Sequence, residues 1–559
     1  MKTRRYLGIM MMAASLVTAT SCSDFDDYNK VPTDVTASVN STLWENISSN
    51  PELSNFARLV KKSGFDTVLA GPSFYTVWAP LNGTYNADSL LQLNDAVVLK
   101  EFVENHIAQS NFLASGQFTE TLRSLNQKAH AFEGSNADYM YAGVTLAQSN
   151  LPSKNGTLHV LNGQANFYPS IMEYIQQVPD QEENLRIDSI CNYLNSYQIS
   201  TLNKEKSVIG PVVNGRQTYI DSVMDVRNSI LDDLLNAKVS EEDSSYTAFL
   251  PTNQAWNASF ARLKSCFRYP AKISSEIYTK NDKTNSYSVS TKTQELAASV
   301  LQDSLTKVNV VRNMFFSNNN SYNQWLVGKD KKYLDSLYST NRGKLSEAET
   351  SMLPHVMKTV KMSNGEVRIV DSLAFNSWDT YNPELELSAR SCLAGIKSGS
   401  AVNIRYIGDE QNYNALVVSP SSAYSRPELY VYLPGVLATK YNIYVQIFRD
   451  KDAGEEKTKP NQLNFQLSYC DANGNLKTAD LLKKVSNSEA FVDTIMAGTF
   501  EFPVAYRGLK NEYAPNIKIT SSFSQFNKTD MATYTRTIRI GSIILRPVEY
   551  DEYLAKKKK

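Results

Sequence analysis

Phe74-Tyr75-Thr76-Val77-Trp78-Ala79-Pro80-Leu81-Asn82 is a stretch that occurs twice in this chain, since a variant follows as Tyr246-Thr247-Ala248-Phe249-Leu250-Pro251-Thr252-Asn253. Each copy is followed downstream by a second motif: Asn155-Gly156-Thr157-Leu158-His159-Val160-Leu161 after the first, and Asn364-Gly365-Glu366-Val367-Arg368-Ile369-Val370 after the second. The repeated order predicts a tandem duplication of one domain. Duplicated modules of this kind usually present surfaces for binding.

Each first motif predicts a short strand with a fixed end, because β-branched and aromatic residues favour strands and proline stops them. The asparagine after each proline is expected to satisfy backbone N–H groups at the following turn. An Asn-Gly pair tolerates positive φ and predicts a tight turn before the next strand. The residues expected to fix this geometry are Thr76, Pro80, Asn82, Asn155, Gly156, Thr247, Pro251, Asn253, Asn364 and Gly365.

Two histidines accompany the first copy. His106 lies among Phe102, Val103 and Ile107, and His159 lies within a predicted strand. An apolar setting of this kind is more typical of a buried, hydrogen-bonded histidine than of a metal ligand. The other two histidines, His130 and His355, have no His or Cys nearby in sequence, so no metal site is predicted.

These motifs resemble those of the fasciclin (FAS1) family. The Thr-Val-Phe-Ala-Pro-Thr-Asn motif of the family corresponds to residues 76–82 and 247–253, and its Asn-Gly-x-x-His-x-Ile segment to residues 155–161. The Tyr-His element of the family appears as Asn105-His106, and the second copy has Arg368 where the family has histidine. The resemblance implies a β-sandwich decorated with helices, and a role in adhesion or extracellular binding without catalysis.

The N-terminus predicts export and lipidation. Basic residues precede a short apolar stretch at 7–17, which is too short to span a bilayer and reads as a cleaved signal peptide. Ala19-Thr20-Ser21-Cys22 resembles a lipobox, so Cys22 is the expected acylated residue. The following Ser23, Asp24, Asp26 and Asp27 resemble the surface-export signal of Bacteroidota-type lipoproteins. We therefore expect a lipid-anchored protein on the outer face of the outer membrane.

The chain divides into six predicted regions. These are a signal peptide at 1–21, a lipidated tether at 22–42, a first FAS1 domain at 43–169, a second FAS1 domain with insertions at 170–384, an antiparallel β-sandwich at 385–550 and a basic tail at 551–559. The sandwich is predicted from a series of short strands separated by turn residues. The polar stretch at 269–293 reads as a surface insertion, and the lysines at 556–559 as a frayed tail. The expected fold class is therefore α+β tandem FAS1 domains followed by an all-β sandwich.

Composition excludes nucleic acid as an expected partner, since 57 basic residues balance 57 acidic ones. The four cysteines after Cys22 are Cys191, Cys266, Cys392 and Cys470. They are far apart and form no CxxC pair, which favours single buried thiols over disulfides.

The predicted function is a cell-surface, non-catalytic binding or adhesion module for a glycan, peptide or matrix ligand, with no cofactor. Aromatic rings that stack on sugars would carry such binding, and the third region offers Tyr424, Tyr430, Tyr432 and Tyr444, although Tyr430 and Tyr432 could equally be core residues. An alternative is that the protein is an accessory subunit of a TonB-dependent nutrient-uptake complex. This alternative rests on the similarity of the domain layout to surface lipoproteins of nutrient-uptake loci, and not on a site.

A glycan-active hydrolase is the third and weakest alternative. Two carboxylates suffice for that reaction, and Asp371, Asp379, Glu384 and Glu386 cluster near the end of the second copy. The sequence contains no GxSxG, HExxH, P-loop or GxGxxG motif. Solvated surface charge explains these acidic residues better than catalysis does, so no catalytic residue is assigned.

Overall fold

The computed structural model describes residues 39–558, except 137, 206, 214, 222–223, 282–285, 330–331, 333–335, 394–395, 399–401, 408–413, 421–425, 450–458, 489 and 525. The chain divides into two compact units. The first comprises the described residues of Met1–Gln177, Lys238–Tyr246 and Val360–Val367. The second comprises those of Val178–Ala237, Thr247–Thr359 and Arg368–Lys559.

The first unit combines short helices with a mixed sheet in the order β2-β1-β7-β6-β5-β4-β3. Its strands are β1 (Tyr75–Pro80), β2 (Ile107–Gln109), β3 (Phe118–Arg123), β4 (Ala129–Ser135), β5 (Asp138–Tyr141), β6 (Val144–Ser153) and β7 (Gly156–Leu161). Its helices are α2 (Leu43–Ser49), α3 (Ser54–Lys62), α4 (Asp66–Leu69), α5 (Ala87–Leu91), α6 (Asp95–Val97) and α7 (Ile171–Gln177), with helical turns η1 (Pro51–Leu53), η2 (Val98–Val103) and η3 (Glu104–His106).

The two repeated-motif strands of the first unit, β1 and β7, are neighbours inside this sheet. β1 runs parallel to β7 and antiparallel to β2. Because side chains alternate along a strand, β1 serves two cores: Val77 and Ala79 pack with the helices, whereas Trp78 packs with Phe132 and Tyr141. The predicted strand is therefore present, buried on both faces.

The second unit begins with a region of helices and short strands. Its helices and helical turns are η4 (Glu183–Leu185), α8 (Asp188–Asn195), η5 (Ile230–Leu234), α9 (Asn253–Cys266), α10 (Ala298–Val311), η6 (Gln324–Val327), α11 (Ala348–Ser351), η7 (Leu353–His355) and η8 (Ser377–Asp379). One sheet has the order β15-β12-β19-β18, made of β15 (Phe315–Ser317), β12 (Tyr246–Pro251), β19 (Gly365–Val370) and β18 (Val356–Met362).

Two-stranded pairs complete this region. They are β8 (Gln198–Leu202) with β11 (Met224–Asn228), β9 (Val208–Val213) with β10 (Arg216–Asp221), β13 (Lys272–Asn281) with β14 (Ser286–Glu295), and β16 (Ser336–Tyr338) with β17 (Lys344–Ser346).

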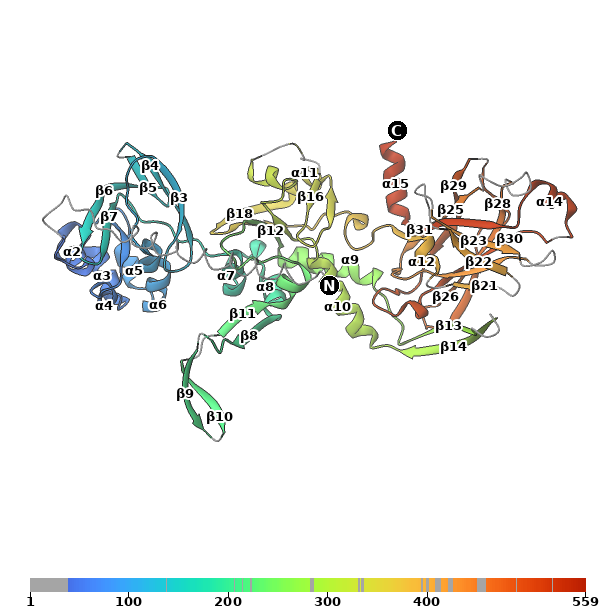
Figure 1. Ribbon diagram of the computed structural model, residues 1–559, viewed down its shortest axis with the longest axis horizontal. Coiled ribbons are helices and arrows are strands. Elements are labelled where there is room, and N and C mark those ends of the chain that lie inside the picture. The colour runs from blue at the N-terminus through green and yellow to red at the C-terminus, as the bar shows by residue number, and fades with distance from the viewer. Residues whose placement is uncertain are drawn as a thin grey trace, which may run out of the picture. The chain divides into compact units, whose positions relative to one another are not determined.

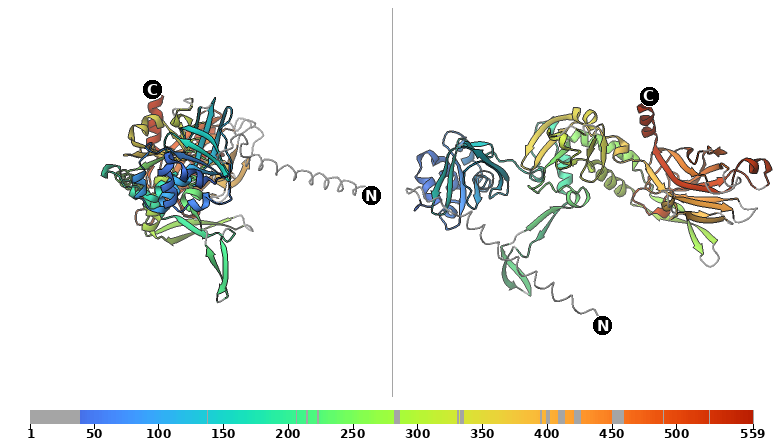
Figure 2. Two further views of the ribbon diagram at one scale, coloured as in Figure 1. Left: turned by 90° about the vertical axis from the view of Figure 1, so that its left-hand side faces the viewer. Right: turned by 45° about the horizontal axis from the view of Figure 1, so that its top comes forward.

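The C-terminal strands form an antiparallel β-sandwich, visible as two layers of orange to red strands (Figures 1 and 2). One sheet has the order β22-β23-β31-β25-β29, with β20 beside β31, and the other β21-β24-β30-β26-β27, with β28 beside β26. Their bounds are β20 (Leu385–Ser388), β21 (Ile396–Ser398), β22 (Val402–Ile407), β23 (Ala415–Pro420), β24 (Glu428–Tyr432), β25 (Lys440–Phe448), β26 (Gln462–Cys470), β27 (Leu476–Asp480), β28 (Val485–Ser486), β29 (Val492–Glu501), β30 (Asn516–Ser521) and β31 (Ile538–Pro547). Short helical segments α12 (Ala389–Leu393), η9 (Asn511–Tyr513) and α14 (Lys528–Thr533) accompany them.

The two sheets of the sandwich share one hydrophobic core. Side chains at alternate positions of β25, such as Ile443 and Val445, pack with Phe465 and Leu467 of β26. This alternation is the pattern expected where one face of each strand is buried. The fold class predicted from the sequence is confirmed, whereas the exact domain boundaries stay a prediction.

Two local predictions were wrong. The segment expected as a surface insertion forms the hairpin β13–β14, in which Ile273 and Ile277 are buried and Ile273 joins the sandwich core. Apolar residues at alternate positions of β13 give that strand a buried face despite its polar composition. The expected frayed tail is instead helical as far as Lys557, because α15 (Val548–Lys557) includes the first two of its lysines.

Candidate functional site

The asparagine of the first Asn-Gly motif is a buried internal brace. Asn155 Oδ1 accepts a hydrogen bond from Leu43 N at 2.8 Å, and its Nδ2 donates to Leu69 O at 2.8 Å and Gly71 O at 2.7 Å. One side chain thus joins the start of α2 to the turn before β1. These contacts commit three of its hydrogen-bonding positions to backbone groups.

Asn364 makes the same set of contacts in the second copy. Its Oδ1 accepts from Ile171 N at 2.9 Å, and its Nδ2 donates to Val239 O at 2.7 Å and Glu241 O at 3.2 Å. As with Asn155, the partners are one N–H at a helix start and two carbonyls just before the central strand.

The glycines that follow are required by space as well as by conformation. Gly156 and Gly365 have φ of +148° and +134°, and a Cβ at either would stand 1.9 Å from a carbonyl oxygen, that of Tyr75 or Tyr246. A side chain at either position would therefore collide with the neighbouring strand.

Asn82 and Asn253 repeat a second contact pattern. Asn82 Oδ1 accepts from Asn55 N at 3.0 Å, and Asn253 Oδ1 accepts from Ser189 N at 2.9 Å, in each case at the first turn of a helix. Their own backbone N–H groups donate to Glu52 O at 2.9 Å and to Arg186 O at 2.8 Å.

The threonine and proline of the motif are also internal. Thr76 and Thr247 are fully buried, and Thr76 Oγ1 donates to Ser110 O at 2.8 Å. Pro80 and Pro251 end β1 and β12.

His106 and His159 each bridge two backbone groups. His106 Nδ1 donates to Phe102 O at 2.7 Å while its Nε2 accepts from Ala165 N at 2.9 Å. His159 Nε2 donates to Phe112 O at 2.9 Å while its Nδ1 accepts from Asn150 N at 3.2 Å. Both rings are therefore neutral, and burial lowers the pKa of each to about 4.

No group of three or more His, Cys, Asp or Glu side chains is arranged to hold a metal among the residues that the structure describes. Cys191, Cys392 and Cys470 are buried free thiols, and Cys266 is a partly buried one. Three of the four candidate carboxylates near the second copy have structural partners: Asp371 with His355 at 2.8 Å, Asp379 with Ser346 N at 2.9 Å, and Glu384 with Arg546. The fourth, Glu386, is exposed on β20.

The candidate ligand-binding tyrosines make contacts within the protein. Tyr432 donates to Glu276 O at 3.0 Å, and Tyr278 of β13 lies 5.6 Å from the ring of Tyr430. Tyr444 donates to Asp551 at 2.7 Å. Their role as ligand contacts stays a prediction. Outside the described residues lie Tyr424, Cys22, Ser23, Asp24, Asp26 and Asp27.

A polar cavity in the second unit is the strongest candidate site. Its volume of about 680 Å³ lies within the roughly 300–1,000 Å³ of typical ligand pockets. It is lined by Arg262, Ser265, Cys266, Arg268, Phe375, Asn376, Ser377, Trp378, Tyr381, Ala438, Thr439, Lys440, Glu501 and Glu549. The walls therefore come from the end of α9, the η8 segment, the facing ends of β25 and β29, and the start of α15.

Hydrogen bonds hold the segments that form these walls together. Ala438 N donates to Cys266 O at 2.9 Å, and Ala505 N donates to Arg268 O at 2.7 Å. Ser377 Oγ donates to Glu549 Oε2 at 2.8 Å, which ties η8 to α15. Burial raises the pKa of Cys266, so its thiol is protonated and a poor nucleophile at neutral pH.

Trp378 is an aromatic residue of the cavity lining that packs on two tyrosines of α15. Its ring stacks on Tyr550 with centroids 5.5 Å apart at 19°, and lies 5.0 Å from Tyr553. Both tyrosines project from α15 three residues apart, which places them on one helix face. These ring contacts hold the indole in place in the absence of a ligand.

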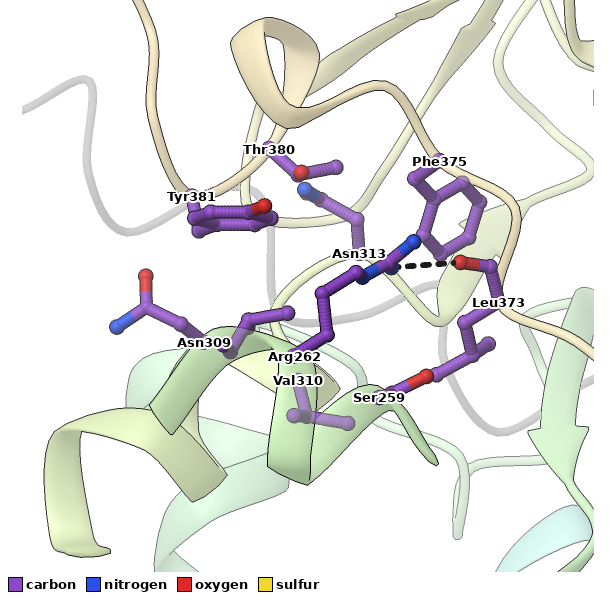
Figure 3. Close-up of a pocket in the computed structure, with 10 residues that line it drawn as sticks. Ser259, Arg262, Asn309, Val310, Asn313, Leu373, Phe375, Thr380 and Tyr381 are labelled. Carbon is purple, nitrogen blue, oxygen red and sulfur yellow. Dashed lines mark hydrogen bonds between the residues drawn. The ribbon is translucent and has the colours of Figure 1, made fainter. Parts of the chain in front are cut away.

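A smaller hollow adjoins this cavity and shares Arg262, Phe375 and Tyr381 with it (Figure 3). The Arg262 side chain reaches toward Leu373 there and donates to its carbonyl oxygen at 3.1 Å (Figure 3). The hollow measures about 20 Å³, room for a single water molecule and not for a ligand.

Sequence reasoning missed this site because its residues are far apart in the chain. Arg268, Trp378, Lys440 and Glu501 belong to none of the repeated motifs. The one signal available was Tyr550 and Tyr553, an aromatic pair at helical spacing before the terminal lysines.

The comparison with protein families concerns the first unit. Residues 51–163 match the Fasciclin domain. This Fasciclin domain contains the first copy of both motifs, so the resemblance is confirmed for that part of the chain. No curated protein matches the sequence.

Several solved structures are similar over parts of the chain. A FAS1 domain pair from the insect cell adhesion molecule fasciclin I is 11% identical, covers 60% of this chain and 99% of its own, and has a TM-score of 0.21. The CBM22-1 xylan-binding domain of Paenibacillus barcinonensis Xyn10C is 12% identical, covers 29% and 92%, and has a TM-score of 0.20. A family 35 carbohydrate binding module from Clostridium thermocellum is 6% identical, covers 30% and 98%, and has a TM-score of 0.17. At such low TM-scores none of these assigns a ligand to this chain.

Proposed function

We propose that this protein is a lipid-anchored cell-surface protein that binds an extracellular ligand without transforming it. The observation that carries the proposal is the Fasciclin domain at residues 51–163. A second FAS1 copy and the C-terminal sandwich would extend it into a row of binding modules.

The repeated contacts support a true duplication. Asn155 and Asn364 each brace one helix start and two carbonyls, and Gly156 and Gly365 each pack against a carbonyl of the central strand. Since these contacts use the polar motif atoms for folding, the motifs are not available as catalytic groups. Ligand binding is then left to other surfaces, among them the 680 Å³ cavity.

The membrane attachment rests on the lipobox-like sequence before Cys22 and on the acidic run after it. Among residues 39–558 as described, no helix is both long and apolar enough to cross a bilayer. Acyl chains on Cys22 would contribute about 0.8 kcal/mol for each buried methylene group, so several chains give a firm anchor.

The test is an affinity pull-down of the full-length protein from mildly crosslinked outer membranes, read by mass spectrometry, together with a glycan and matrix-protein array. Binding of an unaltered glycan, peptide or matrix protein by the isolated protein supports the proposal. Turnover of a bound ligand contradicts it.

A second candidate function is an accessory subunit of an outer-membrane nutrient-uptake complex. It rests on the layout of the chain, a lipoprotein-like N-terminus followed by FAS1 motifs and a β-sandwich, which is an analogy and not a site. A stoichiometric transporter in the pull-down would select this function over the free-standing one.

A further inference from the structure

We infer that the 680 Å³ cavity of the second unit binds an acidic carbohydrate, an inference that rests on the proposed binding function and names its ligand class. Three properties of the cavity carry it: a braced aromatic ring, uncommitted hydrogen-bonding side chains, and an excess of positive charge.

The aromatic ring is Trp378. Sugars present faces of C–H groups that pack against aromatic rings, and a ring held in place loses little entropy on binding. Tyr550 and Tyr553 hold the indole at centroid distances of 5.5 and 5.0 Å, while the residue itself lines the cavity. Trp378 is therefore the residue that we assign to stack against a sugar ring.

The hydrogen-bonding groups are those of Lys440 and Glu501. They lie directly opposite each other on β25 and β29, so a donor and an acceptor stand side by side at the cavity wall. Neither side chain has a hydrogen bond or ion pair with any residue that the structure describes. A pair of neighbouring hydroxyl groups on a sugar matches such a donor and acceptor.

The charge preference comes from Arg268. This side chain is exposed at the cavity and has no ion-pair partner in the described part of the chain. The other arginine, Arg262, donates to Leu373 O, and Glu549 accepts from Ser377. These hydrogen bonds to neutral groups leave both charges in place, so the lining carries three positive and two negative side chains. The excess of one positive charge favours a ligand with a carboxylate, which arginine binds in a two-pronged geometry.

The experiment is calorimetric titration of the purified full-length protein with two probes, an oligogalacturonate and a neutral galactan oligosaccharide of equal length. We expect the oligogalacturonate to bind, and the neutral oligosaccharide to bind at least tenfold more weakly. Trp378→Ala is expected to weaken oligogalacturonate binding at least tenfold, and Arg268→Gln severalfold with a smaller dependence on salt.

Matched controls are Phe526→Ala, an aromatic residue 77% exposed elsewhere, and Lys528→Gln, an exposed lysine on α14. Both should bind as the unaltered protein does. Trp378→Phe keeps an aromatic ring at this position. If it melts at the same temperature as the unaltered protein and retains part of the binding, the weaker binding of Trp378→Ala is due to lost stacking and not to unfolding.

Tighter binding of the neutral oligosaccharide, or oligogalacturonate binding unaffected by Trp378→Ala, would overturn the inference while leaving the proposed binding function in place. Failure of the unaltered protein to bind either probe would also overturn the inference. Failure to bind anything on the glycan and matrix arrays would count against the proposed function itself.

Discussion

At the scale of single residues, the two copies of the motifs share the same hydrogen bonds to the backbone. A buried amide side chain can satisfy three backbone groups at once, and removing it leaves them without partners. Asn155 and Asn364 occupy that position in their respective copies. The motif therefore stabilises the fold, and its removal should lower the free energy of unfolding.

We expect Asn155→Ala and Asn364→Ala each to lower the free energy of unfolding by about 3 kcal/mol or more, since each buried group left unsatisfied costs about 1–3 kcal/mol. Urea unfolding followed by tryptophan fluorescence measures the loss. The control is Asn162→Ala, whose exposed side chain donates only to Thr145 Oγ1 at 3.1 Å, and whose effect should stay below about 1 kcal/mol. Equal effects of Asn155→Ala and Asn162→Ala would show that the hydrogen bonds of the Asn155 side chain do not stabilise the fold.

The buried histidines predict a loss of stability in mild acid. Because the pKa of His106 and His159 falls to about 4 in the fold, the unfolded chain takes up protons first as the pH drops. Their contribution is present above the unfolded pKa of about 6.5 and is lost progressively toward pH 4.

Urea unfolding between pH 7 and pH 4 tests this. His159→Gln should be less stable at pH 7 and should show a shallower fall toward pH 4. His355→Gln is the control, since His355 is partly exposed and pairs with Asp371. A slope unchanged by His159→Gln would contradict the prediction.

At the scale of elements, one buried ammonium ties several segments of the first unit together. Lys128, just before β4, contacts Glu173 of α7 at 2.5 Å, Glu242 at 2.7 Å and Ser363 Oγ at 3.3 Å. Its side chain is only 4% exposed. Partial burial raises the pKa of Glu173, but hydrogen bonds from Lys100 and Lys128 outweigh this and hold it at about 2.

Replacing Lys128 with Met should cost about 3–5 kcal/mol, because it leaves a carboxylate buried without its counter-charge. Lys100→Met is a matched control: its more exposed ammonium contacts the same Glu173 at 2.7 Å, and exposed pairs contribute about 0–1 kcal/mol. The depressed pKa of Glu173 further predicts that this stabilisation is present above about pH 4.5 and fades toward pH 2. Equal losses in the two urea titrations would refute the buried-pair account.

The hairpin β13–β14 belongs to the sandwich core through one of its faces. Ile273→Ala should cost about 2–4 kcal/mol of unfolding free energy, as expected for a truncated buried isoleucine. Val289→Ala on β14, where the side chain is 46% exposed, should cost under about 0.5 kcal/mol. Comparable thermal stability of the two variants would mean that the hairpin is only a surface insertion.

At the scale of the whole molecule, the N-terminal signal should decide where the protein is found. Cys22→Ala removes the thiol that the acyl group needs, so we expect the protein to move from the membrane fraction to the soluble fraction. Replacing Asp24, Asp26 and Asp27 with Ala should leave the anchor intact but reduce surface exposure. Fractionation and protease treatment of intact cells measure both, and a membrane-bound Cys22→Ala variant would exclude this anchor.

The sequence by itself predicted the FAS1-like fold, through the resemblance of its motifs to that family, and the antiparallel strands, through local patterns. Proline stops a strand, Asn-Gly makes a turn, and alternating apolar residues give a strand one buried face. It could not place Tyr430 and Tyr432 beside Tyr278, since that contact depends on how the hairpin β13–β14 packs.

Only the tertiary structure assembled the cavity. Arg268, Trp378, Lys440 and Glu501 belong to separate elements, and nothing in the local sequence of any one requires the others. Their meeting is decided by the packing of η8 on α15 and by hydrogen bonds such as Ala438 N to Cys266 O. The strands and turns follow from short-range patterns along the chain. The cavity depends instead on residues that are far apart in the sequence, and only tertiary packing brings them together.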